Sequence, residues 1–246
     1  MEVALVTVGD ELLAGDTENT NATWLADRLS ARGASVERIL VVPDDRETIA
    51  SHVTTYAETF DAVIVTGGIG GTPDDVTLEA VADAFDRSLA VNDRALDHVK
   101  ETLREIEDRL PEIDLDVETE ASIPAGARPL LNEVGLAPGC VIEGVYVFPG
   151  IPEELRGMFE GVVAEFSGDV VSKFLYTTEP EANLIPTLRE VEAELDVGIG
   201  CYPDRDAGHN RLKISATDDA ALTDASTWLL ERVDASETPV ERDWSA

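Results

Sequence analysis

Strand-like and helix-like segments alternate along the first hundred residues, and this alternation constrains the fold more than any other feature. Three short apolar runs rich in β-branched residues are predicted strands, at 2–8, 36–42 and 62–66. Apolar residues at helical spacing follow each run, over 21–31, 49–60 and 78–85. Because parallel strands must be joined by crossovers, this order predicts an α/β fold, a three-layer α/β/α domain with a mostly parallel sheet.

The remainder of this first domain gives weaker signals. A helix is predicted where Leu96, Val99, Leu103, Ile106 and Leu110 recur on one side. Residues 111–138 are expected to form mostly loop, since Pro, Gly and acidic residues interrupt any period. One strand broken by Gly144 is expected over 141–148, followed by a helix over 155–166. Thr20 is the expected N-cap of the helix over 21–31.

A second domain is predicted after the sequence Ser167-Gly168-Asp169, which divides the chain into residues 1–167 and 168–246. The second part has a βαββα pattern: a strand near 170–177, a helix over about 180–195, strands around Ile199 and Ile214, and a final helix near 222–233. This pattern is typical of a small α+β module. The tail from Glu237 onward is expected to fray.

Charge and composition exclude several classes of function. The 18 basic and 51 acidic residues give a net charge of −33, which argues against nucleic acid or an anionic membrane as partner. No apolar run has the roughly 20 residues that a membrane span needs, and no secretion signal is visible. The acids are spread along the chain and Lys is scarce, as in halophilic proteins of a salt-rich cytoplasm. Two distant cysteines argue against a disulfide framework and indicate a reducing, cytoplasmic location.

The segment 66–77, Thr-Gly-Gly-Ile-Gly-Gly-Thr-Pro-Asp-Asp-Val-Thr, is the strongest functional signal. It links a buried strand to a helix, and its four glycines allow close backbone approach to a ligand and positive φ. Helix N-termini bind anions through free N–H groups, so the segment predicts a phosphate- or oxyanion-binding loop. The alternative is a tight turn with Thr72 as N-cap, Pro73 in the first helical position and Asp75 three residues on.

Three further segments fall near the same predicted sheet edge. Residues 9–15, with Asp10 and Glu11, follow the first strand and could hold a hydrated Mg²⁺, although two solvated acids are an equal alternative. Asp44 and Asp45 follow the second strand, where acids are also expected from the helix dipole alone. The Pro-Gly turns at 138–139 and 149–150 either are simple turns or form a rigid rim. No nucleophile elbow accompanies any Ser, so a triad hydrolase is not expected.

Taken in order, these segments resemble the molybdopterin-binding domain family, and within it the CinA-like branch (competence/damage-inducible protein A). The resemblance rests on Gly9-Asp10-Glu11-Leu12-Leu13, Pro43-Asp44-Asp45, the 66–77 loop, Asn132…Gly135…Pro138-Gly139 and Phe148-Pro149-Gly150-Ile151-Pro152. It covers residues 1–166, and residues 170–246 resemble the KH-like domain that follows in CinA. A nicotinamide-mononucleotide deamidase domain of full-length CinA has no counterpart in this chain, so that activity is not carried over.

The resemblance implies a phosphorylated small molecule as ligand, a divalent metal (Mg²⁺ or Co²⁺) as cofactor without a tightly bound organic one, and a homo-oligomer. It places the two important carboxylates at Asp44 and Asp75, which would orient the nucleophile and hold Mg²⁺. Asp10 and Glu11 are secondary metal candidates. The expected substrate-binding residues are Gly9, Asp10, Glu11, Asn21, Thr66, Gly67, Gly68, Gly70, Gly71, Thr72, Asn132, Gly135, Pro138, Gly139, Pro149 and Gly150.

Three functions remain open from the sequence. The first is a metal-dependent nucleotide pyrophosphatase of the CinA type, acting on ADP-ribose or a relative. The second is molybdenum cofactor biosynthesis, by molybdopterin binding or adenylylation. The third is a non-catalytic nucleotide- or pterin-binding module. RNA is not expected despite the KH-like resemblance, because residues 167–246 carry 7 basic and 17 acidic residues, a net charge of −10.

Overall fold

The computed structural model describes residues 1–106 and 115–240, and the chain divides into two compact units, Met1–Gly168 and Asp169–Ala246. The predicted division after residue 167 lies one residue before this observed one. Within the described residues, no helix is both long and apolar enough to cross a membrane. Each unit has its own hydrophobic core, so each is described by itself.

The N-terminal unit is built on a six-stranded sheet of order β2-β1-β3-β8-β7-β6. The first four strands in this order are parallel, whereas β7 and β6 are antiparallel additions. Its elements are β1 (Glu2–Val8), α1 (Asp10–Ala14), α2 (Thr20–Ser30), β2 (Ser35–Val42), α3 (Arg46–Ala57), β3 (Ala62–Thr66), α4 (Thr77–Ala84), β4 (Leu89–Val91), α5 (Asp93–Ile106), α6 (Val117–Glu120), β5 (Ser122–Pro124), β6 (Arg128–Leu130), β7 (Gly139–Ile142), β8 (Val145–Phe148), α7 (Pro152–Glu160) and a 3₁₀ turn (Val163–Glu165).

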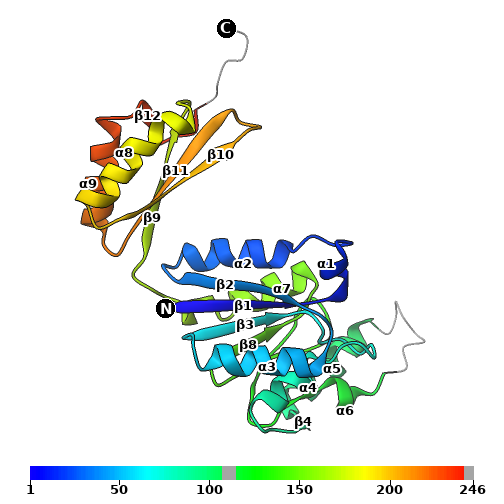
Figure 1. The fold of residues 1–246 in the computed structure, drawn as a ribbon. Helices are drawn as coiled ribbons and strands as arrows, with labels where there is room; N and C mark the ends of the chain where they lie inside the picture. The colour runs from blue at the N-terminus through cyan, green and yellow to red at the C-terminus, as the bar shows by residue number, and fades with distance from the viewer. Residues whose placement is uncertain (107–114, 241–246) are drawn as a thin grey trace. The chain divides into compact units, whose positions relative to one another are not determined.

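Helices cover both faces of this sheet, which confirms the predicted mixed α/β domain with a mostly parallel sheet (Figure 1). On one face, Ile49 of α3 and Val81 of α4 pack with Val6 and Val65. The other face buries apolar side chains of α2 and α7 against the alternate residues of the same strands. This alternation follows from the period of two along a strand, and it explains why the central strands are apolar throughout.

Several local predictions were wrong. The N-cap of α2 is Asn19, whose side chain accepts a hydrogen bond from the N–H of Ala22, and Thr20 is already helical. The expected single strand over 141–148 is a hairpin of β7 and β8. Glu143 and Gly144 form its turn with φ of 46° and 83°, the left-handed pair that a tight two-residue hairpin requires. The isolated glycine therefore marks a reversal of the chain.

The segment predicted as loop also differs, since α6, β5 and β6 lie between residues 117 and 130. Short β4 pairs with β5, and β6 pairs with β7 at the sheet edge. These elements are too short to show a periodic pattern in the sequence. Whether such a short segment forms a strand depends on the strand with which it pairs. Leu110, predicted on the fourth helix, lies outside the described residues. Helix α7 ends at Glu160, so Val162 and Phe166 contribute to the core from beyond it.

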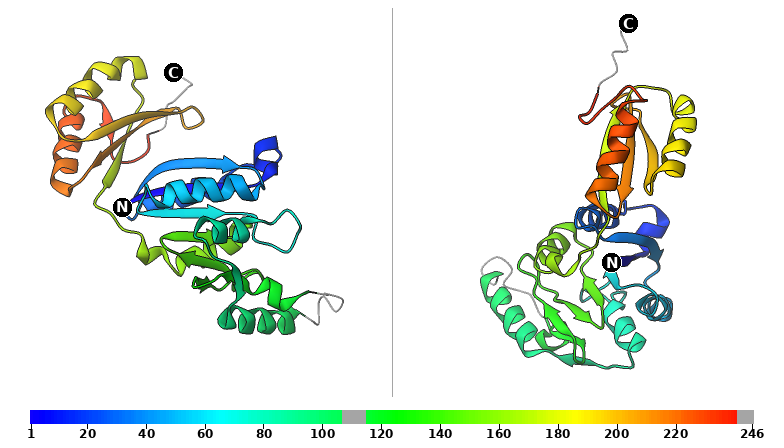
Figure 2. Two further views of the ribbon diagram at one scale, coloured as in Figure 1. Left: turned by 60° about the horizontal axis from the view of Figure 1, so that its bottom comes forward. Right: turned by 90° about the vertical axis from the view of Figure 1, so that its left-hand side faces the viewer.

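The C-terminal unit is a small α+β domain, as the βαββα pattern predicted. It contains β9 (Val171–Thr177), α8 (Glu181–Glu194), β10 (Gly198–Asp204), β11 (His209–Ala216), α9 (Asp219–Leu230) and the unpredicted β12 (Ala235–Ser236). The four strands form an antiparallel sheet of order β10-β11-β9-β12. Both helices contribute to one core with β9 and β11 (Figure 2).

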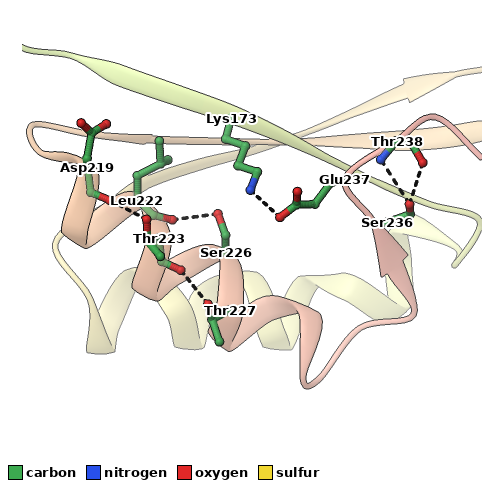
Figure 3. A network of polar contacts seen from close by, with 9 residues as sticks. All are labelled: Lys173, Asp219, Leu222, Thr223, Ser226, Thr227, Ser236, Glu237 and Thr238. Atoms are coloured by element: carbon green, nitrogen blue, oxygen red, sulfur yellow. Dashed lines mark hydrogen bonds and ion pairs between the residues drawn. The ribbon is translucent and has the colours of Figure 1, made fainter.

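Helix α9 satisfies its small polar side chains locally. The hydroxyls of Thr223, Ser226 and Thr227 each donate to the carbonyl four residues earlier (Figure 3). Lys173 of β9 pairs with Glu237, which follows β12. These contacts satisfy three side-chain hydroxyls within α9 and join β9 to the segment after β12.

Candidate functional site

A cavity of about 460 Å³ opens at the carboxyl ends of the parallel strands of the N-terminal unit. Loops that follow β1, β2, β3 and β8 contribute to it, as expected for ligand sites in open α/β sheets. Its lining consists of Val8, Gly9, Glu11, Asp44, Gly67, Gly68, Ile69, Gly70, Asp74, Asp75, Glu120, Leu136, Ala137, Pro149, Gly150, Ile151 and Glu154. The cavity therefore brings together residues from all five segments singled out in the sequence.

The glycine-rich loop begins with two residues in left-handed conformation. Gly67 has φ of 96° and Gly68 has φ of 65°. A Cβ at Gly67 would lie 2.3 Å from the carbonyl oxygen of Val8, and one at Gly68 would lie 2.5 Å from Oγ1 of Thr77. Glycine is thus required at both positions for conformation and for space. The loop is held against the end of β1 and the start of α4.

Four consecutive amides of this loop are free to bind a ligand. Within the described part of the chain, no acceptor receives a hydrogen bond from the N–H groups of Gly68, Ile69, Gly70 or Gly71. The flanking amides are occupied, since Gly67 donates to the carbonyl of Phe148 and Thr72 donates to the carboxylate of Asp75. Successive free amides in such a loop form an anion-binding concavity.

Helix α4 begins later than the capping alternative predicted. Thr77 is its first residue, Val76 occupies the N-cap position, and no side chain caps this end. Thr72 and Asp75 form a separate turn instead: the Thr72 hydroxyl donates to Asp75 Oδ2 over 2.6 Å, and the Asp75 amide donates to the Thr72 carbonyl over 2.9 Å. This turn fixes the Asp75 carboxylate beside Gly70, where a Cβ would lie 2.6 Å from its Oδ2.

Six carboxylates line the cavity, and no Lys, Arg or His is among its described lining residues. They belong to Glu11, Asp44, Asp74, Asp75, Glu120 and Glu154. Asp44 is oriented by the backbone, because the amide of Asp10 donates to its Oδ2 over 2.8 Å. Burial raises the pKa of the Glu120 carboxyl, and the negative charge of Asp75 raises it further. The cavity is therefore strongly acidic apart from the free amides of its loop.

The acids suit hard cations in kind but do not form a complete cage. Among residues 1–106 and 115–240, no three His, Cys, Asp or Glu side chains are grouped closely enough to hold a metal ion. Magnesium needs only one or two protein carboxylates when water and substrate phosphates supply its other ligands. Asp75 and Glu120 are close enough for the charge of one to shift the pKa of the other.

Not every predicted site residue reaches this cavity. Asp10 contributes its amide to Asp44, but its own carboxylate is not part of the lining. Gly71 lines an adjoining hollow beside Glu120, and Asn21 and Thr66 line a smaller chamber. Thr72, Asn132, Gly135, Pro138 and Gly139 lie outside the lining of the main cavity. Gly139 is a packing residue, since a Cβ there would lie 2.2 Å from the carbonyl oxygen of Val147.

Asn132 organises the rim of the cavity from a fully buried position. Its Oδ1 accepts hydrogen bonds from the amides of Val134 and Gly135, at 3.3 and 2.8 Å. Its Nδ2 donates to the carbonyl of Ala137 over 3.2 Å and to Glu154 Oε2 over 2.7 Å. Gly135 leaves room for that carboxylate, because a Cβ there would lie 2.3 Å from Glu154 Oε1. Asn132 thus positions a side chain of the cavity without lining it.

The sequence interpretation missed Asp74, Glu120 and Glu154. Glu120 lies at the end of α6, in the segment predicted as loop. Glu154 lies in the first turn of α7, where an acid is expected from the helix dipole alone. Neither position carries a local signal that separates a site residue from the many other acids of this chain.

Comparison with protein families places the N-terminal unit. Residues 4–168 match the family described as "Probable molybdopterin binding domain". The chain belongs to this family. Residues 169–240 match a second model, "FAD synthase, middle domain", so the molybdopterin-binding-family domain is followed here by a domain of that kind. These comparisons do not show a KH-like domain. They support a small α+β domain with an antiparallel sheet that matches this second model.

Relatives support the CinA-like assignment within the molybdopterin-binding family. A "CinA-like protein" of Citrifermentans bemidjiense is 42% identical over 167 residues, which are 66% of this chain and 40% of that protein. A protein of Archaeoglobus fulgidus is 34% identical over 220 residues, covering 89% of this chain and 92% of its own length. Among solved structures, CinA of Thermoplasma acidophilum, whose function is described as unknown, is 31% identical with a TM-score of 0.61, covering 68% of this chain and 99% of that one.

Proposed function

We propose that the chain is a metal-dependent nucleotide pyrophosphatase of the CinA type, which hydrolyses ADP-ribose or a related nucleotide. One observation carries the proposal: a single cavity combines six carboxylates with three lining residues whose backbone amides are free, Gly68, Ile69 and Gly70, and has no described basic side chain. The amides suit an anionic group, and the carboxylates suit a divalent cation that accompanies it. A pyrophosphate with its metal ion satisfies both halves of the site.

Electrostatics favours a metal-bound anion over a free one. Two like charges at ~4 Å repel by about 4 kcal/mol at an effective dielectric constant near 20, so the surrounding acids disfavour a bare pyrophosphate. Asp75 and Glu120 are the residues that we assign to the metal, because they lie next to the free amides of the loop. Glu11 remains a third candidate, whereas the side chain of Asp10 does not line the cavity. A bound Mg²⁺ or Co²⁺ supplies charge neutralisation at the phosphoryl oxygens.

The residues of the chain then bind and orient the reactants. The amides from Gly68 to Gly70 hold phosphoryl oxygens, and Asp44 orients the attacking water from a position fixed by the Asp10 amide. Water forms a new bond to one phosphorus while the bridging P–O bond breaks, so that ADP-ribose and water give AMP and ribose 5-phosphate. Positioning and charge neutralisation supply most of the rate enhancement in such displacements at phosphorus.

The direct test is AMP release from ADP-ribose by the purified protein at high salt with Mg²⁺ or Co²⁺. We expect turnover by the wild type and its loss in Asp75→Ala and in Asp44→Ala. The matched control is Asp27→Ala, which removes an exposed acid of α2 that does not line the cavity, and it should retain full activity. Absence of turnover with every metal, or unchanged turnover in Asp75→Ala, would overturn the proposal.

Molybdopterin processing is the second candidate, favoured by the description of the matching family. It predicts that a fluorescent pterin co-purifies with the protein or binds it in a titration. Adenylyl transfer from ATP to molybdopterin would require triphosphate binding, for which the described cavity lining offers no Lys or Arg. Calorimetry separates both enzymes from a binding module, because a module should keep its affinity for nucleotide or pterin in Asp44→Ala and Asp75→Ala.

A further inference from the structure

A second, smaller chamber adjoins the main cavity on the side of α2. Its volume is about 90 Å³, and it shares Val8, Glu11, Gly67 and Gly150 with the lining of the main cavity. Thr7 and Thr66 are register partners at the ends of β1 and β3, and both line the chamber. They fall on the sheet face that carries α2 and α7, where the strand residues before them are apolar. Two hydroxyl groups thus replace apolar side chains at the edge of a core.

Two residues that line this chamber each have a buried oxygen atom without a hydrogen-bond partner within the described residues. The two atoms are Oγ1 of Thr66 and Oδ1 of Asn21, in side chains that are 3% and 8% exposed. Rotation of the Asn21 side-chain amide would not give its oxygen a partner at no cost, because Nδ2 donates to the carbonyl of Gly150 over 2.7 Å and this hydrogen bond would be lost. Leaving a buried polar group unpaired costs about 1–3 kcal/mol, so these atoms are expected to pair with a group that is not part of the chain.

The chemistry of the chamber defines that group. Asn21 Oδ1 can only accept, and so it requires an O–H or N–H donor. The hydroxyl of Thr7 accepts from Asn19 Nδ2 over 3.0 Å, which leaves its proton available to a ligand. Glu11 and Glu18 also line the chamber, and they disfavour an anion. The volume corresponds to roughly three water molecules at ~30 Å³ each. A small, uncharged group rich in hydroxyls fits these conditions.

We propose that this chamber binds the hydroxyls of the second sugar of a nucleotide pyrophosphate, the sugar that does not carry the base, while the phosphates lie on the loop at Gly68–Gly70. The inference rests on the proposed function for the placement of the phosphates, and it adds the chemical class of the group attached to them. Gly67 and Gly150 line both spaces, so a sugar esterified to the bound phosphate is close enough to enter the chamber. Thr66 and Asn21 then select a substrate that carries this second sugar over one without it.

The test compares two substrates and two variants of one residue. ADP-ribose carries a sugar on both phosphates, whereas the β-methyl ester of ADP keeps the pyrophosphate and its charge but lacks the second sugar. Thr66→Val removes the hydroxyl with little change of shape in a strand, and Thr66→Ser restores it. Loss of one or two hydrogen bonds predicts a three- to ten-fold lower kcat/KM of Thr66→Val for ADP-ribose, with no change for the methyl ester. Thr66→Ser should retain the wild-type preference.

Binding measurements keep this inference distinguishable from the proposed function. Calorimetry with the non-hydrolysable α,β-methylene analogue of ADP-ribose should show weaker binding to Thr66→Val even if no substrate is turned over. In that outcome the hydrolase proposal fails and the chamber assignment stands. Equal kcat/KM for both substrates in the wild type, or an equal effect of Thr66→Val on both, would mean that the chamber holds only water. Circular dichroism of each variant verifies folding, and the comparison of the two substrates in the wild type provides the readout should Thr66→Val not fold.

Discussion

Replacement of Asn132 by Ala tests how the rim of the cavity is held together. The substitution removes four side-chain hydrogen bonds from a fully buried position. Three join neutral partners and one joins the Glu154 carboxylate. At about 0.5 kcal/mol for each neutral bond and ~1.5 kcal/mol for the charge-assisted one, both lower limits, the unfolding free energy should fall by about 3 kcal/mol. The midpoint of the N-terminal unit should then fall by roughly 6–12 °C, given 2–4 °C per kcal/mol for a domain of this size.

Differential scanning calorimetry at constant high salt is the appropriate assay, because it can resolve separate transitions of the two units. The matched control is Asn92→Ala, which removes two hydrogen bonds from the start of α5, to the amides of Arg94 and Ala95. Loss of such a cap costs about 1 kcal/mol. If Asn132→Ala lowered stability no more than Asn92→Ala does, Asn132 would not organise the rim, and the assignment of Glu154 to a fixed position would be wrong.

Three further outcomes follow from the same geometry. Gly67→Ala should destabilise the N-terminal unit by more than ~1–2 kcal/mol, because φ at this position is 96° and the new Cβ would lie 2.3 Å from the Val8 carbonyl oxygen. Denaturant unfolding measures this change, and an unchanged unfolding midpoint would contradict the loop conformation. Glu120→Gln should stabilise the metal-free protein at neutral pH. The pKa of Glu120 is raised in the folded state, so the ionised carboxylate is unfavourable there. The stability advantage of Gln should therefore shrink as the pH falls and vanish below the ordinary carboxyl pKa of 4.5. A difference in melting temperature that stays constant between pH 7 and pH 4 would refute this prediction. Burial raises the pKa of the Cys140 thiol to about 12, so native protein at pH 8 should be alkylated at Cys201 first. If mass spectrometry found Cys140 modified before unfolding, its side chain would be accessible and the prediction would be wrong.

Sequence patterns predicted the parallel strands β1, β2 and β3 correctly because strands and helices alternate along this part of the chain. β1 and β3 are apolar, β-branched and almost fully buried on both faces, whereas β2 lies at the sheet edge and is partly exposed. The same topology placed the loops after these strands at one edge, and Asp44, Asp75 and Gly70 do line one cavity. Their catalytic and binding roles remain predictions.

The antiparallel half escaped prediction for a physical reason. The hairpin of β7 and β8 has a turn at Glu143 and Gly144, which local composition does not distinguish from a bulge within one strand. Strands β5 and β6 are three residues long, so only their pairing with β4 and β7 makes them strands. Glu120 was missed for the same reason, because it lies in α6, within the segment that was predicted as loop.

The sequence by itself determined the layered architecture and the presence of a glycine-rich loop after β3. Both follow from local sequence, because hydrophobic periodicity and backbone conformational freedom are local properties. The tertiary structure alone decided which of the many acids face one another and which polar atoms lack partners. Asn21 and Gly150 are 129 residues apart, yet their hydrogen bond leaves the oxygen of Asn21 unpaired in the chamber. Electrostatic and hydrogen-bonding energies depend on distance in space, and only the packed fold sets that distance.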